Sequence, residues 1–206
     1  ALVREARENY LGGFVEGTIR WSDGKMEPAI HPYMSAYTTL TSLALGENEP
    51  VAEEFFWYLL HSTATHAFPE GIFYKRHFAW SNTIPHATGA SNYAILLRHI
   101  LLHEQGEDLH LLAGIPDTWL DDGAEIVLER APTHFGPMTL HVQGTPQGVR
   151  VTLDPPTRNA PKRITLHLPK TRLLEKPLEN VEVVLRNPQS KQLDFPSLVA
   201  HYLANK

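Results

Sequence analysis

Residues 66–86 read HAFPEGIFYKRHFAWSNTIPH and separate two stretches that have the apolar periodicity of helices. A connection of this length inside a compact domain is usually either functional or disordered. Its composition does not fit disorder, because it contains six large apolar side chains: Phe68, Ile72, Phe73, Tyr74, Phe78 and Trp80. The same segment carries polar and charged groups: Glu70, Lys75, Arg76, His77, Asn82 and His86. We therefore expect a packed loop that holds the functional site.

The composition is that of a globular protein. The chain has 206 residues, 42% hydrophobic and 20% charged, with a formal net charge of -5. This charge, without any run of lysine or arginine, predicts neither nucleic acid nor an anionic membrane as a partner. No stretch approaches the roughly 18 apolar residues of a membrane-spanning helix. The absence of cysteine excludes disulfides, thiolate catalysis and cysteine-bound metals.

Residues 1–113 have helical periodicity, and we expect four helices there. The first is predicted over residues 2–15 and the second over residues 33–45, where Gly46 ends it.

The third predicted helix begins at Pro50, a residue that suits a first helical turn, and continues to Leu60. The fourth has an apolar stripe over residues 93–101 and is expected to end just before Gly106.

The lengths of the connections predict where the site lies. The second and third helices are joined by a short turn, whereas long loops precede the second and follow the third. In an antiparallel stack this places residues 18–32 and 65–86 at the same end, facing each other. That surface collects eleven candidate residues: Trp21, Asp23, Glu27, His31, Glu70, Tyr74, Arg76, His77, Trp80, Asn82 and His86.

The remainder of the chain predicts short strands, because alternating runs are broken by proline and glycine. We expect strands over 125–129, 138–143, 149–153, 163–168 and 181–185. Ile164, Leu166 and Leu168 are expected to face the core, with Thr165 and His167 facing outward. The predicted fold is therefore α+β, with helices in residues 1–113, an antiparallel β-sandwich-like domain in 114–206, and a linker over 113–123.

The run HAFPEGIFYKRHFAWS, followed by a helix that continues into a β domain, resembles the last active-site loop of the (α/α)6 six-hairpin glycosidases. The resemblance extends over nearly the whole chain, but its individual motifs are loose. Such a barrel has six helical hairpins, whereas this chain supplies about two. The resemblance thus implies the C-terminal part of a longer enzyme, or one subunit of a split one, with the remainder of the enzyme or a second chain completing the barrel.

The resemblance implies that Glu70 is the catalytic base, which activates water in an inverting reaction. Glycoside hydrolysis needs a second carboxyl group. Glu27 and Asp23 are the acids of the facing loop, and either could be that group or bind sugar hydroxyls; the proton donor is otherwise expected outside this chain. The structural alternative for Glu70 is a turn cap or an ion pair with Arg76.

Aromatic and imidazole side chains are the candidate sugar contacts. Trp21 and Trp80 could stack on sugar faces, although a buried core role is the alternative for each. Trp57 and Trp119 are expected to be packing residues. The histidines at 31, 77 and 86 could donate to hydroxyls or influence Glu70, or could be satisfied by backbone carbonyls.

A metal site is not predicted. His99 and His103 are four residues apart with Glu104 adjacent, but the order HxxxHE differs from HExxH of zinc proteases. No cofactor-binding motif occurs. The leading functional hypothesis is a carbohydrate-active enzyme that hydrolyses O-glycosidic bonds. Two alternatives remain open: a polysaccharide lyase that uses Tyr74, His77 or Arg76, and a non-catalytic carbohydrate-binding or assembly subunit.

Overall fold

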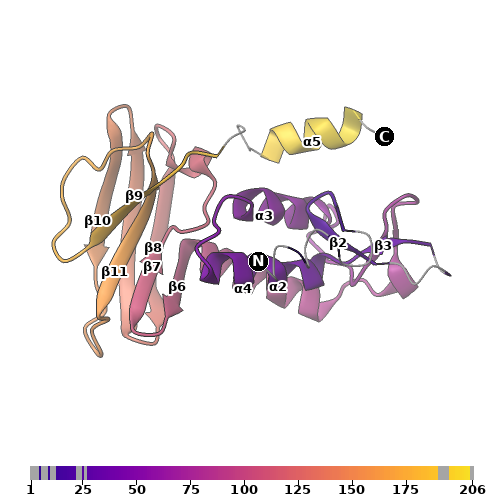
Figure 1. The fold of residues 1–206 in the computed structure, drawn as a ribbon, viewed down its shortest axis with the longest axis horizontal. Coiled ribbons are helices and arrows are strands. Elements are labelled where there is room, and N and C mark those ends of the chain that lie inside the picture. Colours follow the sequence, from indigo (N-terminus) through magenta and orange to yellow (C-terminus); the bar gives the residue numbers. More distant parts are fainter. Residues whose placement is uncertain are drawn as a thin grey trace. The chain divides into compact units, whose positions relative to one another are not determined.

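The structure is a computed structural model that describes residues 13–21, 27–189 and 195–204, together with Glu5, Asn9 and Lys25; the side chains of Asn82 and His201 lie outside this description. The described residues form helices and mostly antiparallel sheets, so the predicted α+β class is confirmed (Figure 1).

The chain divides into two compact units. The first contains residues 1–99 and 195–206, and the second contains residues 100–194. The division into a helical domain over 1–113 and a β-rich domain over 114–206 stays a prediction. The compact units are divided between residues 99 and 100, and the C-terminal helix belongs to the first unit.

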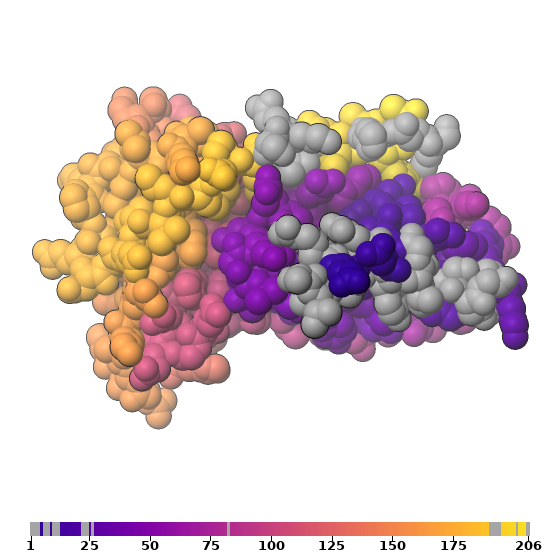
Figure 2. Space-filling model, in the orientation of Figure 1, coloured from indigo at the N-terminus to yellow at the C-terminus, as the bar shows by residue number. Residues whose placement is uncertain are grey.

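Four helices belong to the described part of the chain: α2 (Pro32–Ala44), α3 (Val51–Leu60), α4 (Ala87–Leu101) and α5 (Phe195–Ala204). The bounds of α2 and α3 agree with the prediction to within one residue. In the first unit α5 lies along α3 (Figures 1 and 2), where the ring of Phe195 is 6.0 Å from that of Phe56.

Two of the predicted helices end differently in the structure. The predicted helix over 2–15 lies largely outside the described residues, but Phe14 and Val15 form a strand, so its C-terminal end was wrong. The fourth helix ends at Leu101 rather than near Gly106. Gly106 instead lies in a two-residue turn, and His103 is in a strand rather than on the helix face of His99.

The two long loops of the first unit contribute short strands to one sheet. Its antiparallel order is β1-β2-β3-β4-β5, formed by β1 (Phe14–Val15), β2 (Thr18–Trp21), β3 (Ala29–Ile30), β4 (Ile72–Phe73) and β5 (Phe78–Ala79). Ile30 of the first loop pairs with Ile72 of the second. The prediction that residues 18–32 and 65–86 face each other is therefore confirmed.

A tight hairpin starts this sheet. Val15 pairs with Thr18, and the two residues between them, Glu16 and Gly17, have φ angles of 50° and 65°. Positive φ at both central positions is the geometry of a type I′ turn, whose twist matches that of the strands it joins. The turn packs against α3, because an added Cβ on Gly17 would lie 2.4 Å from Cδ1 of Trp57.

The second unit consists of two sheets. One sheet is antiparallel and has the strand order β10-β9-β8, and the other has the strand order β12-β11-β7-β6. The strands are β6 (Leu102–Gln105), β7 (Asp108–Leu111), β8 (Glu125–Thr133), β9 (Gly136–Thr145), β10 (Gly148–Asp154), β11 (Arg163–Pro169) and β12 (Glu182–Arg186).

Both sheets contribute to one apolar core, as expected for a sandwich. Leu140 of β9 packs in the same core as Leu166 and Leu168 of β11. The inward orientation predicted for Ile164, Leu166 and Leu168 is confirmed, whereas Thr165, predicted to face outward, is buried.

Two further expectations for this unit were wrong. The sandwich is not entirely antiparallel, because β11 pairs in parallel with both β7 and β12. The segment 113–123 does not link the two compact units either, because it lies within the second unit. Ile115 and Leu120 are fully buried in the core, and Trp119 packs against it as predicted.

Candidate functional site

An aromatic cluster gathers the ends of several short strands in the first unit. Trp21 ends β2, His31 follows β3 and caps α2, and Trp80 follows β5. Gly71 directly precedes β4 and its carbonyl accepts a hydrogen bond from the backbone N–H of Trp80 over 2.8 Å. The register places His31, Gly71 and Trp80 beside one another, because the ends of β3 and β5 both lie next to the start of β4. Trp21 joins this cluster through its ring contacts with His31 and Trp80.

Trp80 is the centre of this cluster. Its ring centroid lies 5.1 Å from that of Trp21, 4.8 Å from that of His31 and 5.9 Å from that of Phe73. Phe73 stacks on it with an interplanar angle of 9°. Trp80 is half-buried and three rings already contact it, whereas two rings contact Trp21, so Trp21 is the better candidate for stacking on a ligand.

His31 is the buried polar group of the cluster. It is 6% exposed, and neither ring nitrogen has a hydrogen-bond partner among the described residues. A Cβ added to Gly71 would lie 2.9 Å from Cε1 of His31, so only glycine permits this approach. Burial lowers the pKa of His31, and the negative charge of Glu70 partly opposes that effect.

Glu70 lies at the edge of the cluster and is half-buried. Its backbone N–H donates to the carbonyl of Thr83 over 3.2 Å, which fixes the start of the turn into β4. Its charge acts on both His31 and Tyr33. No hydrogen bond or ion pair joins the Glu70 carboxylate to another side chain in the described part of the chain. The predicted alternative, an ion pair with Arg76, is absent there.

Arg76 pairs with the other candidate acid. Its Nε lies 2.6 Å from Oε2 of Glu27, and its guanidinium carbon lies 5.2 Å from the ring centre of Phe73. This ion pair joins the two predicted loops. Glu27 and Glu70 therefore differ in environment: Glu27 is paired with a cation, whereas Glu70 has no described ion pair and its charge acts on His31 and Tyr33.

Tyr33 is a member of the site that the sequence analysis missed. Its ring lies 6.1 Å from that of His31 and 5.1 Å from that of His86, in both cases nearly perpendicular. Burial raises the pKa of Tyr33, and Glu70 raises it further. Its carbonyl accepts a hydrogen bond from Nδ2 of Asn92 over 2.9 Å. The sequence feature that could have pointed to Tyr33 is its position directly after the candidate residue His31 and Pro32, at the start of a predicted helix.

His86 has a structural role. Its Nδ1 accepts the backbone N–H of Gly89 over 3.2 Å, and so satisfies a donor at the start of α4. Its own backbone N–H donates to the carbonyl of Phe68 over 2.7 Å. Of the remaining candidates, Tyr74 is half-buried in the turn between β4 and β5, Asp23 lies outside the described residues, and so does the side chain of Asn82.

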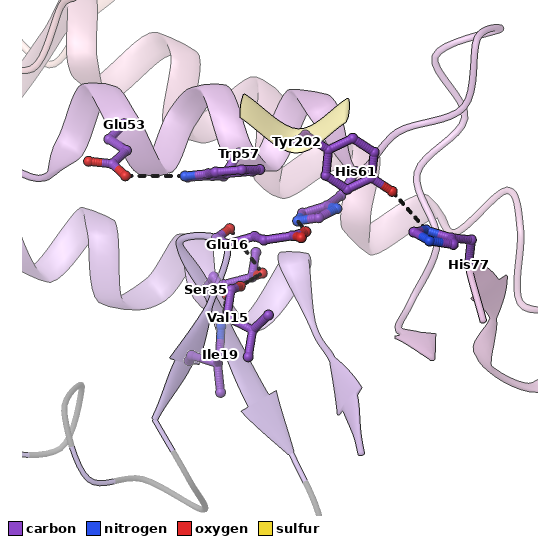
Figure 3. Close-up of polar contacts among 10 residues, drawn as sticks. Val15, Glu16, Ile19, Ser35, Glu53, Trp57, His61, His77 and Tyr202 are labelled. Atoms are coloured by element: carbon purple, nitrogen blue, oxygen red, sulfur yellow. Dashed lines mark hydrogen bonds and ion pairs between the residues drawn. The ribbon is translucent and has the colours of Figure 1, made fainter. Parts of the chain in front are cut away.

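His77 lies away from the cluster and contacts α5. Figure 3 shows the hydroxyl of Tyr202 pointing toward Nδ1 of His77, at a distance of 2.7 Å. The backbone of His77 is left-handed, with φ of 52°, at the end of the β4–β5 turn. His77 and Trp80 therefore make different contacts: His77 contacts Tyr202 of α5, whereas Trp80 packs against three rings of the cluster.

Another histidine, His61, lies beneath the β1–β2 hairpin. Its Nε2 is 3.4 Å from Oε2 of Glu16, and its ring stacks on Trp57 (Figure 3). Burial lowers the pKa of His61 to about 4. Trp57 also donates its indole N–H to Glu53 over 3.3 Å. The burial of Trp57 confirms its predicted packing role.

Three histidines share one face of the four-stranded sheet in the second unit. His103 stacks on His110, and Nδ1 of His110 lies 3.0 Å from Nε2 of His167. Burial is the main cause that lowers the pKa of His167 to about 4. Despite this row, no group of three or more potential ligands among the described residues is arranged to hold a metal ion.

No described helix combines the length and the apolar character needed to cross a membrane. Comparison with known proteins gives no match to a family model, to a curated protein or to a solved structure.

Proposed function

We propose that the chain is the C-terminal part, or a subunit, of a carbohydrate-active enzyme that hydrolyses O-glycosidic bonds, with Glu70 as one of its two carboxylates. The observation that carries the proposal is the environment of Glu70. It is a half-buried carboxylate without a described ion pair, and its charge acts on the buried ring of His31 and the half-buried ring of Tyr33, which belong to the aromatic cluster. Aromatic rings beside a carboxylate suit a ligand with apolar faces and a polar rim.

Glu70 is the better candidate base of the two acids. A general base must remain ionised and hold a water molecule near the reacting carbon. Oε2 of Glu27 is paired with Arg76, whereas Glu70 has no described ion pair and its charge acts on His31 and Tyr33. We propose that the proton donor comes from the remainder of the enzyme or from a second chain, which would also complete a helical toroid around the site.

The lyase alternative has less support. Two of its three candidate groups are engaged elsewhere: Arg76 with Glu27, and His77 with the hydroxyl of Tyr202. A lyase would generate an unsaturated uronate that absorbs in the ultraviolet, so product absorbance separates the two reactions. Binding of sugar without any turnover by the complete assembly would favour the non-catalytic alternative.

The test is Glu70→Gln in the complete enzyme, compared with Glu27→Gln. Glutamine keeps the shape of the side chain but cannot act as a base. Turnover should fall by about a hundredfold or more while the dissociation constant for substrate stays nearly unchanged. The proposal is wrong if Glu70→Gln keeps turnover within about threefold of the parent while Glu27→Gln abolishes it.

The need for a partner is tested separately. The isolated 206-residue chain should show no glycosidase activity, and the natively purified protein should have a mass above the 23.2 kDa of this chain. An interface that completes the site should bury well over about 1,000 Å². An active monomer of 23.2 kDa would contradict this part of the proposal.

A further inference from the structure

The charges around the aromatic cluster distinguish between classes of sugar. Recognition of a sugar carboxylate normally uses an arginine or lysine that can form charge-assisted hydrogen bonds. In the described part of the chain, Arg76 touches the Phe73 ring of the cluster, and its Nε is already paired with Oε2 of Glu27 over 2.6 Å. Lys75 in the same turn is exposed, and no contact described in the structure joins it to the cluster.

The environments of two titratable rings of the cluster, those of His31 and Tyr33, favour their neutral forms. Burial lowers the pKa of His31, which favours the uncharged imidazole. Burial and the charge of Glu70 raise the pKa of Tyr33, which favours the uncharged phenol. His86 uses Nδ1 to accept the N–H of Gly89. The charge that shifts the pKa of both His31 and Tyr33 is the negative charge of Glu70.

The hydrogen-bonding groups of His31 match a hydroxyl. A neutral imidazole offers one donor and one acceptor, whereas a carboxylate can only accept. Both ring nitrogens of His31 are buried and without a partner among the described residues. Buried polar atoms are rarely left without hydrogen bonds, and a group that both donates and accepts would satisfy this ring fully.

We infer that the cluster selects neutral, hydroxyl-bearing sugars against uronates, with His31 and Glu70 as the specificity-determining residues. This inference rests on the proposed function and narrows its substrate class. A uronate would bring a second carboxylate toward Glu70. Its carboxylate would offer His31 only a hydrogen-bond acceptor, whereas a hydroxyl offers both a donor and an acceptor. Like charges that meet in a partly dehydrated site disfavour binding strongly.

Matched glycans test the inference. The natively assembled protein would be titrated with neutral oligosaccharides and their uronate counterparts: glucose with glucuronate, galactose with galacturonate, and mannose with mannuronate. In whichever of these pairs binds, the neutral sugar should bind at least about tenfold more tightly than its uronate counterpart. Glu70→Gln should reduce this ratio to within about threefold, because it removes the negative charge. His31→Phe should weaken binding of the neutral sugar more than binding of the uronate.

Glu129→Gln is the matched control. Glu129 is exposed on β8, and this substitution changes the net charge of the protein by the same amount without touching the cluster. It should leave the ratio unchanged. Equal or tighter binding of the uronate by the parent protein would overturn the inference while leaving the proposed function intact. Failure of every glycan in the panel to bind would overturn the proposed function itself.

Discussion

Nε of Arg76 and Oε2 of Glu27 lie 2.6 Å apart, and this ion pair connects two segments that are distant in the sequence. It also decides which acid of the site is neutralised. The Arg76 side chain is 62% exposed, so the pair contributes at most about 1 kcal/mol to stability. Its main consequence is electrostatic, because Glu70 is left without a described ion pair and its charge acts on His31 and Tyr33.

The first prediction concerns the hairpin that begins the five-stranded sheet. Gly17→Ala should lower the free energy of unfolding by about 2–4 kcal/mol, measured by urea denaturation. Part of the loss comes from the left-handed backbone, with φ of 65°, and part from the added Cβ, 2.4 Å from Cδ1 of Trp57.

Gly46→Ala is the control for that backbone contribution. Gly46 also has a positive φ, of 73°, but nothing lies within 4 Å of an added Cβ. Its substitution should cost only about 1 kcal/mol. Equal losses for the two variants would show that the hairpin does not pack closely on Trp57.

The second prediction concerns the contact between Gly71 and His31. Gly71→Ala should force the imidazole to shift, because the new Cβ would lie 2.9 Å from Cε1 of His31. We expect a loss of about 1–3 kcal/mol in stability and a change in tryptophan fluorescence, since Trp21 and Trp80 touch this ring.

A double-mutant cycle isolates that contact. In a His31→Ala background the same Gly71→Ala substitution should cost clearly less, because the ring it would strike is gone. An additive result, with the same cost in both backgrounds, would contradict the geometry described for the cluster.

The third prediction concerns pH. The pKa of His61 is lowered to about 4 by burial, against 6.5 for a solvated histidine. Between these values the unfolded chain binds more protons than the folded one. Stability from this residue is therefore fully present above about pH 6.5 and is lost as the pH falls toward 4, by up to about 3 kcal/mol.

His61→Phe provides the comparison, because phenylalanine keeps a ring that can stack on Trp57 but cannot take up a proton. Unfolding of both proteins by denaturant from pH 7.5 to 4 gives the difference in slope. Parallel curves for the two proteins would mean that His61 takes up its proton equally in the folded and unfolded states.

The fourth prediction compares two leucines that face each other across neighbouring strands of the second unit. Leu168 of β11 pairs with Leu185 of β12, but the first is fully buried and the second is 47% exposed. Leu168→Ala should cost about 2–5 kcal/mol, whereas Leu185→Ala should cost less than about 1 kcal/mol. Similar losses would mean that the core extends beneath β12.

Much of the local structure was predictable from the sequence. Apolar periodicity located α2 and α3, and alternation located β8 to β11, because both patterns reflect which residues of a short segment face the core. Loop lengths also placed the two candidate loops at one end. The hairpin of β6 and β7 was missed, because residues 101–112, LLHEQGEDLHLL, continue the apolar spacing of the helix before them.

The composition and these local patterns thus determined the α+β class, most element positions and the candidate residues, because they depend on neighbouring side chains. Only the tertiary structure decided that β11 pairs in parallel, that Arg76 binds Glu27 and not Glu70, and that His31 is buried against Gly71 and Trp80. These are contacts between distant segments, and their partners are selected by packing and charge in three dimensions rather than by spacing along the chain.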